Sequence, residues 1–418
     1  MTIRFAAALA VLSLAVSGCA QDQADTEPLA VAYTQAEIDG SLPPSAATVA
    51  MRWHLLDPEV NSFIFRNTQD VFAFRMVSAP ATPRDLPQGT ALALPQATLA
   101  GAEVGYDQWA DGTFTNALLV LRDGQVVFED YRNRMTAETP HIAFSMTKTI
   151  TAMLVGQALE RGEIDSLDDL ASKYVPALAD GAYGQATLRN VLEMRSGADI
   201  EERYDFGENP SLAGQIHRDA IVLNQRRFAD FAVGIGQRSE PGATFNYATL
   251  DTAVLGWVLE EATGHKLEDL MEQRIWQPLG TEHDGHFLAD GPVGTGRALN
   301  GMGFNATLRD FGRLGQLLLD DGMAGETRVL PEGWVAQMTA MKPTGASAGE
   351  GFPGYGLQTW QVDGEPGAYA AVGLAGQFIY VHPSTHTVVI KLSYYPPVPP
   401  ATTDGDVLGF FARIANGS

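Results

Sequence analysis

The organisation of this chain follows from residues 141–162, which read HIAFSMTKTITAMLVGQALERG. A short apolar segment leads into Ser145, and apolar residues then recur at the i, i+3 and i+4 spacing of a helix. Gly162 is suited to end that helix, because glycine readily adopts the left-handed conformation found just after many helices. The pattern predicts a helix over residues 145–162, with Ser145 in or just before its first turn.

Lys148 lies three residues after Ser145, which puts both side chains on one face of a helix. A serine hydroxyl is a weak nucleophile until a neighbouring base takes its proton, and a lysine one turn along can reach it. The N–H groups and dipole of a helix N-terminus also favour a developing oxyanion. The alternative is a capping serine followed by a solvated lysine. Because the run after Lys148 is apolar nearly all round, we instead expect a buried lysine, which requires a reason.

The chain has 418 residues, of which 45% are hydrophobic and 18% are charged. This length supports a large core and exceeds one minimal domain. The formal net charge of −23 repels nucleic acid and anionic membrane surfaces, and the sequence contains no run of Lys or Arg. We therefore expect no nucleic-acid partner, and we interpret the acidity as a contribution to solubility.

The first residues are typical of an export signal. Arg4 precedes an apolar stretch at residues 5–16 that is too short to span a bilayer. The sequence Leu-Ala-Val-Ser-Gly-Cys that ends at Cys19 resembles the bacterial lipobox, in which the cysteine becomes the lipidated first residue. We expect a lipoprotein signal peptide at residues 1–18 and a lipid anchor on Cys19, which would hold the protein at a membrane in the periplasm or cell envelope. The alternative is a chance cysteine in an ordinary signal peptide; either way the single cysteine predicts no internal disulfide.

Residues 19–50 are polar and predict a flexible tether, whereas residues 51–100 begin with enough aromatic side chains to wrap onto the body of the protein. Asp123-Gly124 predicts the turn of a hairpin between strands at 117–121 and 126–128. The remaining patterns predict helices at 145–162, 187–195, 249–263, 266–275, 306–320 and 331–341, strands at 369–372, 378–381 and 388–392, and a closing helix at 408–415.

Strands at both ends of the body, with helices between them, predict an α+β fold in which one antiparallel sheet is formed from both ends of the chain and flanked by helices. Residues 101–144 and 345–418 would form this sheet domain, and residues 145–344 a mostly helical inserted domain. We expect the functional site at the seam between them, which is a preferred place for clefts.

Two further segments are candidates for the same site. Residues 240–249 form a Pro-Gly turn that delivers Tyr247 to the start of a helix, although a tyrosine packed under a loop gives the same pattern. Residues 371–377 read as a strand interrupted by glycines, which permits close approach of a ligand or reflects a simple bulge. An N–H group of this strand could complete an oxyanion hole with the Ser145 N–H.

Other motifs are less persuasive. Residues 345–349 match the G-x-S-x-G nucleophile elbow around Ser347, but the flanking Pro and Gly residues allow neither the strand nor the helix which that elbow requires. His283 and His286 have no third ligand at a recognised spacing, so we expect no metal and no cofactor. The scattered histidines give no sequence support for a Ser-His-Asp triad.

The order of Ser145-x-x-Lys148, Tyr247-Ala-Thr249 and a Gly-bearing strand near the C-terminus resembles the serine β-lactamase and penicillin-binding-protein-like superfamily, in particular its class C branch. Within that branch the chain is most similar to the 6-aminohexanoate-dimer hydrolase and carboxylesterase group. The supporting segments lie at residues 61–66, 144–148, 192–197, 202–205, 278–284, 305–310 and 376–377.

The resemblance implies a β-lactamase-like fold and assigns roles to individual residues. Ser145 would be the acylated nucleophile, and Lys148 and Tyr247 its proton-handling partners. The Leu374 N–H, just after Gly373, would form the oxyanion hole together with the Ser145 N–H. Tyr204, Thr249 and Gly373 are candidates for substrate contact, and relatives have a tyrosine near position 204 that lines the site.

Two departures from the branch bear on the substrate. Thr249 stands where the β-lactamases have asparagine, and Ala371-Val372-Gly373 replaces their Lys-Thr-Gly. The missing lysine removes the cation that would hold a β-lactam carboxylate, so a neutral ester or amide is favoured. Free lysine and tyrosine titrate near about 10.4 and 10, and we expect burial to lower the pKa of Lys148 and a neighbouring ammonium to lower that of Tyr247.

The sequence therefore predicts an exported serine hydrolase that cleaves a small ester or amide through an acyl-serine intermediate. Its activity would be like that of 6-aminohexanoate-oligomer hydrolases or carboxylesterases. A D-amino-acid peptidase or a β-lactamase would use the same catalytic residues. A non-catalytic envelope lipoprotein that binds peptidoglycan or a partner is the alternative from a different class.

Overall fold

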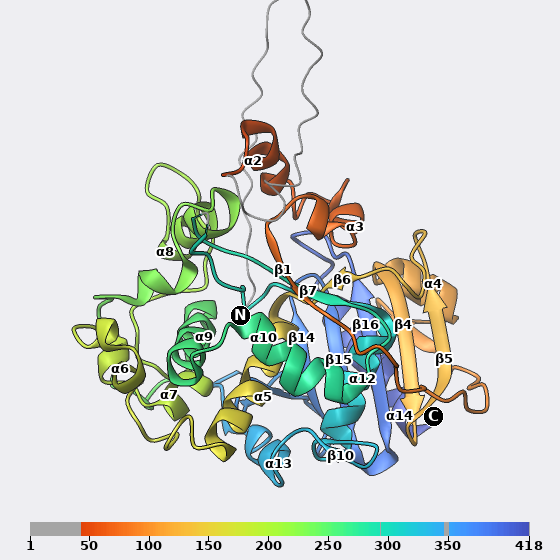
Figure 1. The fold of residues 1–418 in the computed structure, drawn as a ribbon. Helices are drawn as coiled ribbons and strands as arrows, with labels where there is room; N and C mark the ends of the chain where they lie inside the picture. Colours follow the sequence, from red (N-terminus) through yellow and green to blue (C-terminus); the bar gives the residue numbers. More distant parts are fainter. Residues whose placement is uncertain (1–42, 293, 347–350, 418) are drawn as a thin grey trace, which may run out of the picture.

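The computed structural model describes residues 43–292, 294–346 and 351–417 (Figure 1). Its main sheet has eight antiparallel strands in the order β11-β12-β13-β14-β15-β16-β4-β5. The hairpin of β4 (Thr115–Arg122) and β5 (Gln125–Tyr131) pairs with β16 (Thr387–Ser393), so strands from both ends of the chain share one sheet. This arrangement confirms the predicted α+β fold. Figure 1 shows the sheet on one side of the molecule and α6, α7, α8 and α9 on the other.

Each central strand is buried on both faces. Leu118 and Val120 of β4 belong to one core with Trp109, whereas Leu119 and Leu121 belong to the other core, as the two-residue period of a strand requires. One face is covered by α4 (Tyr106–Gly112) and α14 (Thr403–Asn416), and the other by α12 (Leu308–Leu319). Strands buried on both faces explain why these segments read as continuous apolar runs rather than alternating ones.

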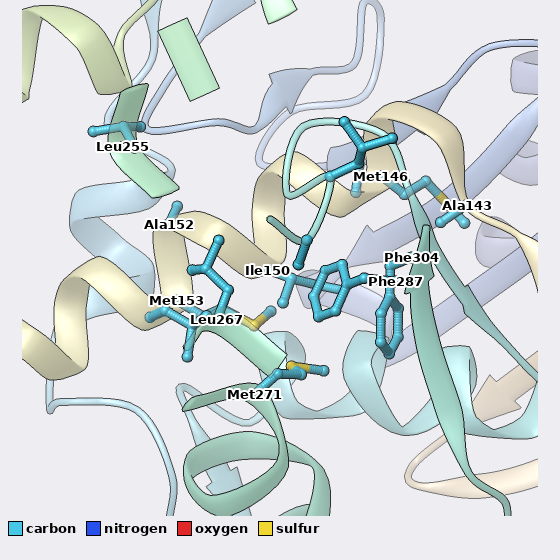
Figure 2. Packing of buried hydrophobic residues seen from close by; sticks show 14 of the residues in the cluster. Ala143, Met146, Ile150, Ala152, Met153, Leu255, Leu267, Met271, Phe287 and Phe304 are labelled. Carbon is cyan, nitrogen blue, oxygen red and sulfur yellow. The ribbon is translucent and has the colours of Figure 1, made fainter. Parts of the chain in front are cut away.

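Two long helices form the centre of the helical region. They are α5 (Thr147–Glu160) and α9 (Thr249–Thr263), which pack against each other and are buried over most of their lengths. Figure 2 shows Ile150 and Met153 of α5 close to Leu267 and Met271 and near the Phe287 and Phe304 rings. A helix that is apolar all round must be surrounded by protein, so the tertiary structure fits the pattern read from the sequence.

A second, four-stranded sheet anchors the segment before Ser145. It has the order β1-β7-β8-β6, with β1 (Phe74–Val77), β7 (Gly285–Leu288), β8 (Phe304–Ala306) and β6 (His141–Ile142). The N-terminal residues thereby reach the body of the protein through β1. Helix α2 (Ala46–Trp53) precedes it and starts inside the segment that we expected to be a flexible tether.

Several elements differ in length from the sequence prediction. The helices expected at 187–195 and 331–341 are the shorter α7 (Leu188–Leu192) and α13 (Trp334–Met338), and the closing helix α14 is longer than expected. The helix expected at 266–275 is α10 (Leu267–Met271), a π-helical turn (Glu272–Trp276) and α11 (Gln277–Leu279). The short strands β11 (Lys342–Pro343), β12 (Gly354–Tyr355) and β13 (Trp360–Gln361) at one end of the main sheet were not predicted. None of the described helices is long and apolar enough to cross a membrane.

Candidate active site

Ser145 lies in one turn of 3-10 helix (Phe144–Met146) that runs directly into α5. The residue before it, Phe144, has a φ of +44°, a left-handed conformation that is rare for a bulky side chain. The Phe144 ring is held edge-to-face against Phe65, with 4.9 Å between ring centroids. The Ala143 N–H donates to the carbonyl of Phe304 at 2.8 Å. Packing and hydrogen bonding thus maintain a strained turn at Ser145.

Lys148 extends back along α5 toward this turn, and its side chain is 1% exposed. Its Nζ lies 2.9 Å from Ser145 Oγ, 3.0 Å from Thr249 Oγ1 and 2.7 Å from the carbonyl oxygen of Gly301. Within residues 141–150 only Ser145 is partly exposed. Ser145 is thus in contact with solvent, whereas the amine beneath it is buried.

Burial lowers the pKa of Lys148 to about 8, since an ammonium loses its hydration in the protein interior. The carboxylates of Glu202 and Asp251 act in the opposite direction and raise that pKa. A large fraction of Lys148 is consequently neutral in mildly alkaline solution, which is the form that can accept a proton.

Tyr247 comes to the same place from the loop before α9. Lys148 Nζ lies 5.1 Å from the centroid of its ring, and its hydroxyl hydrogen-bonds with Ser145. The ring packs beside Trp360 at 5.3 Å and meets Tyr355 edge-to-face at 6.1 Å. The unpredicted short strands β12 and β13 thus supply the wall that holds Tyr247 in position.

The direction of the Tyr247 pKa differs from our expectation that an ammonium would lower it. Desolvation raises the pKa of Tyr247, and the negative charge of Glu202 raises it further, while the hydrogen bond with Ser145 acts the other way. In the resting site the pKa of Lys148 is shifted toward neutral pH, whereas the pKa of Tyr247 is shifted away from it.

Strand β14 (Tyr369–Gly373) ends directly beside the turn that contains Ser145. A Cβ atom at Gly373 would lie 2.2 Å from the carbonyl oxygen of Ala143, so only glycine fits there. The predicted strand 371–377 is in fact interrupted, because residues 374–376 form a tight turn before β15 (Gln377–His382). Leu374, the proposed second oxyanion donor, is the first residue of this turn and is 40% exposed.

The three candidates for substrate contact differ in exposure and in hydrogen-bond partners. Thr249 is 4% exposed, and its hydroxyl contacts Lys148 and Glu202, so its position does not support a direct substrate contact. Tyr204 is partly exposed and its hydroxyl donates to Glu202. Gly373 is buried, and its backbone forms the edge of the site.

Comparison with known proteins identifies the family of the chain. Residues 107–409 match the β-lactamase family. The chain belongs to the β-lactamase family. It is 30% identical over 301 residues to the 6-aminohexanoate-dimer hydrolase of Paenarthrobacter ureafaciens, an alignment that covers 69% of this chain and 75% of the relative.

Solved structures share the fold at lower sequence identity. One is a Bacillus anthracis protein described as a candidate 6-aminohexanoate-dimer hydrolase, with a TM-score of 0.76, 23% identity, and coverage of 87% of this chain and 95% of that one. Another is a family VIII carboxylesterase, with a TM-score of 0.57, 14% identity, and coverage of 74% and 95%. The chain is thus a serine hydrolase of the β-lactamase-like superfamily, related to 6-aminohexanoate-dimer hydrolase.

Sequence reasoning missed three residues of this β-lactamase-family site. The carbonyl of Gly301 accepts from Lys148, and the Glu202 carboxylate lies behind Thr249. The buried Gln377 side chain donates to the carbonyls of Leu374 at 3.1 Å and Ser393 at 2.9 Å, which fixes the turn after β14. Glu202 and Gln377 both lie in segments that carry the family resemblance, at residues 202–205 and 376–377, although neither was named as a site residue; Gly301 comes from a loop without a local motif.

The remaining motifs concern Ser347, Cys19 and the histidines. Ser347 and Cys19 lie outside the described residues. His286 is buried, with Nε2 3.1 Å from the Thr68 hydroxyl. Over the described ranges, no three His, Cys, Asp or Glu side chains are placed to share a metal ion.

Proposed function

We propose that this serine hydrolase cleaves a neutral ester or amide through an acyl-enzyme on Ser145, with Lys148 and Tyr247 as the proton-handling pair. The observation that carries the proposal is the 2.9 Å contact between a partly exposed serine hydroxyl and a buried amine whose pKa is lowered to about 8. Such a pair meets the geometric and protonation requirements for general-base activation of a nucleophile.

The steps follow from these positions. Lys148 accepts the Ser145 proton, directly or through Tyr247, as Oγ bonds to the substrate carbonyl carbon. The N–H groups of Ser145 and Leu374 stabilise the oxyanion. Tyr247 passes the proton to the leaving oxygen or nitrogen, and the bond to the leaving group breaks. Water then attacks the acyl-serine, gives up its proton to the same pair, and the acid leaves as Ser145 recovers its hydrogen.

Position 371 supports a neutral substrate. Where class C β-lactamases have the lysine of Lys-Thr-Gly, this chain has Ala371, whose side chain is 1% exposed and carries no charge. The relatives named above include a 6-aminohexanoate-dimer hydrolase and a carboxylesterase. We therefore propose short esters and ω-amino-acid oligomers as substrates, in preference to β-lactams or D-amino-acid peptides.

A substrate panel tests this proposal. We expect kcat/KM for p-nitrophenyl esters or for 6-aminohexanoate oligomers to exceed that for nitrocefin by at least about 10- to 100-fold, because the charge-assisted bond to the β-lactam carboxylate is missing. A fluorophosphonate ester should add one covalent phosphonyl group to Ser145, identified by peptide mass spectrometry. Preferred turnover of nitrocefin would overturn the substrate assignment. Absence of any adduct would favour a binding lipoprotein.

We also propose that the protein is exported and anchored through Cys19, on the strength of the apolar segment at residues 5–16 and the lipobox-like residues before the cysteine. Expression in a bacterial host should place the protein in the membrane fraction, with a mature chain that starts at a diacylated Cys19. We expect Cys19→Ala to move it to a soluble fraction. Equal membrane recovery of both proteins would contradict the anchor.

A further inference from the structure

We infer that Glu202 is a positioning residue of this site, which fixes the direction of the Thr249 hydroxyl and thereby turns the lone pair of Lys148 toward Ser145. The inference rests on the proposed function, in which Lys148 accepts the Ser145 proton. It gives a role to a carboxylate that does not itself meet the reacting atoms, and to Thr249 as the link between that carboxylate and the lysine.

The first step is the hydrogen-bond inventory of Lys148. A neutral amine has two N–H donors and one lone pair, and Nζ has three polar neighbours within 3.0 Å. The Gly301 carbonyl oxygen can only accept, so it takes one N–H. The hydroxyls of Ser145 and Thr249 can each donate or accept, so they compete for the single lone pair.

The second step is the position of Glu202. Its Oε1 lies 2.8 Å from Thr249 Oγ1, and an ionised carboxylate can only accept. Since a hydroxyl has one hydrogen, the Thr249 hydroxyl donates to Glu202 and offers a lone pair to Lys148. Lys148 therefore gives its second N–H to Thr249, and the lysine lone pair is left for the Ser145 hydroxyl alone.

Glu202 is itself held in one orientation. Its Oε2 accepts the backbone N–H of Thr249 at 2.8 Å, at the first residue of α9, where the helix dipole favours a negative charge. The Tyr204 hydroxyl donates to Oε1. Two side-chain hydroxyls and one backbone amide thus fix both carboxylate oxygens, and the orientation of the Thr249 hydroxyl follows from theirs.

This arrangement also explains how threonine can stand where class C β-lactamases have asparagine. An amide oxygen is a hydrogen-bond acceptor in every environment, so asparagine presents a fixed acceptor to the lysine. A hydroxyl can either donate or accept a hydrogen bond, so a second group must determine which of the two it does toward the lysine. The Glu202–Thr249 pair supplies such a fixed acceptor with two residues instead of one.

Glu202→Gln is the most informative substitution because it reverses this polarity. The Thr249 N–H still demands an acceptor, so the amide oxygen takes the place of Oε2 and the NH2 group faces Thr249 Oγ1. The Thr249 hydroxyl then accepts from this NH2 group and is free to donate to Lys148, in competition with Ser145. We expect kcat for a p-nitrophenyl ester to fall about 10- to 100-fold with little change in KM. This loss is smaller than the full contribution of general-base catalysis, because Lys148 is still present.

The pH profile separates this role from simple structural support. Wild-type kcat/KM should fall as the pH drops through about 8, because Lys148 must be neutral to accept a proton. The groups that face Lys148 are the hydroxyl of Ser145, the Tyr247 ring, and the carboxylates of Glu202 and Asp251, both of which raise its pKa. Removing the Glu202 charge should move the acidic limb to lower pH, so the Glu202→Gln defect is larger at pH 9 than at pH 6.5.

Matched variants complete the test. Glu201→Gln makes the same chemical change at the next residue, which pairs with Arg238 near the surface, and should leave both kcat and the pH profile unchanged. Thr249→Ser keeps the hydroxyl and should stay within a few-fold of wild type, whereas Thr249→Val should lose kcat as Glu202→Gln does. Thr249→Asn should restore kcat in the Glu202→Gln background, because the amide oxygen needs no orienting partner.

The inference fails if Glu202→Gln retains the wild-type kcat and acidic limb, or if Thr249→Val is as active as Thr249→Ser. It also fails if Thr249→Asn gives no rescue while the circular dichroism spectrum of the double variant is native. The proposed function fails separately, through the absence of a fluorophosphonate adduct on Ser145 in the wild-type protein. A labelled Ser145 with unaffected Glu202 variants would reject only the positioning role.

Discussion

Ser145→Ala should reduce kcat/KM toward p-nitrophenyl esters by about 10⁴-fold or more, to the level of binding and oxyanion stabilisation alone. Ser145 is partly exposed and its hydroxyl lies 2.9 Å from the buried Lys148 amine, so the substitution removes the proposed nucleophile. Steady-state kinetics measure the loss, and the variant should take up no fluorophosphonate.

Two variants test whether this loss is specific to the proposed machinery. Lys148→Met fills the same space with an uncharged side chain and should lose a comparable share of kcat/KM, since the proton acceptor is gone. Ser347→Ala removes the serine of the G-x-S-x-G match and should remain near wild type. An inactive Ser347→Ala protein beside an active Ser145→Ala protein would transfer the nucleophile to the other serine and reject the mechanism.

Gly373→Ala should lower kcat/KM by about 10²- to 10³-fold, the cost of losing one oxyanion donor. The added methyl group would lie 2.2 Å from the carbonyl oxygen of Ala143, a backbone atom that cannot rotate away. Relief of this overlap must push the end of β14 away from the Ser145 turn, and the Leu374 N–H moves with it. We also expect a loss of about 1–3 kcal/mol in the free energy of unfolding, as for other overpacked sites.

Gly409→Ala is the matched control, because a Cβ at Gly409 in α14 meets nothing within 4 Å. It should keep full activity and gain slightly in thermal stability, since alanine is favoured over glycine within a helix. Enzyme assays and differential scanning calorimetry compare the two proteins. Full activity in a Gly373→Ala protein of normal stability would show that the end of β14 takes no part in catalysis.

Local patterns predicted much of the fold for a physical reason. Residues 147–160 and 249–263 repeat apolar side chains at helical spacing, and both segments are long enough for the period to be read without neighbours. The central strands are buried on both faces and therefore read as apolar runs between turn residues. The short strands β11, β12 and β13 have two residues each, which is too few to show an alternation of apolar and polar residues.

The proposed proton-handling pair was predictable only in part. The three-residue spacing of Ser145 and Lys148 is a property of one helix, so it could be read from the chain. The pKa of Tyr247 could not, because its direction depends on how much water the surrounding loops exclude and on the charge of Glu202, which is distant in sequence. An ammonium was expected to lower that pKa, but burial of Lys148 favours its neutral form.

The sequence by itself determined the hydroxyl, the amine one helical turn away, and the longer strands of the sheet, because the pattern that marks each of them lies within one short segment of the chain. The tertiary structure alone decided which groups surround that amine. Gly301, Thr249 and Glu202 are all distant from Lys148 in the sequence; the family resemblance pointed to Thr249, but no local pattern placed any of the three around the amine. The direction in which a proton can move depends on the donors and acceptors brought together there, and so it is a property of the folded chain.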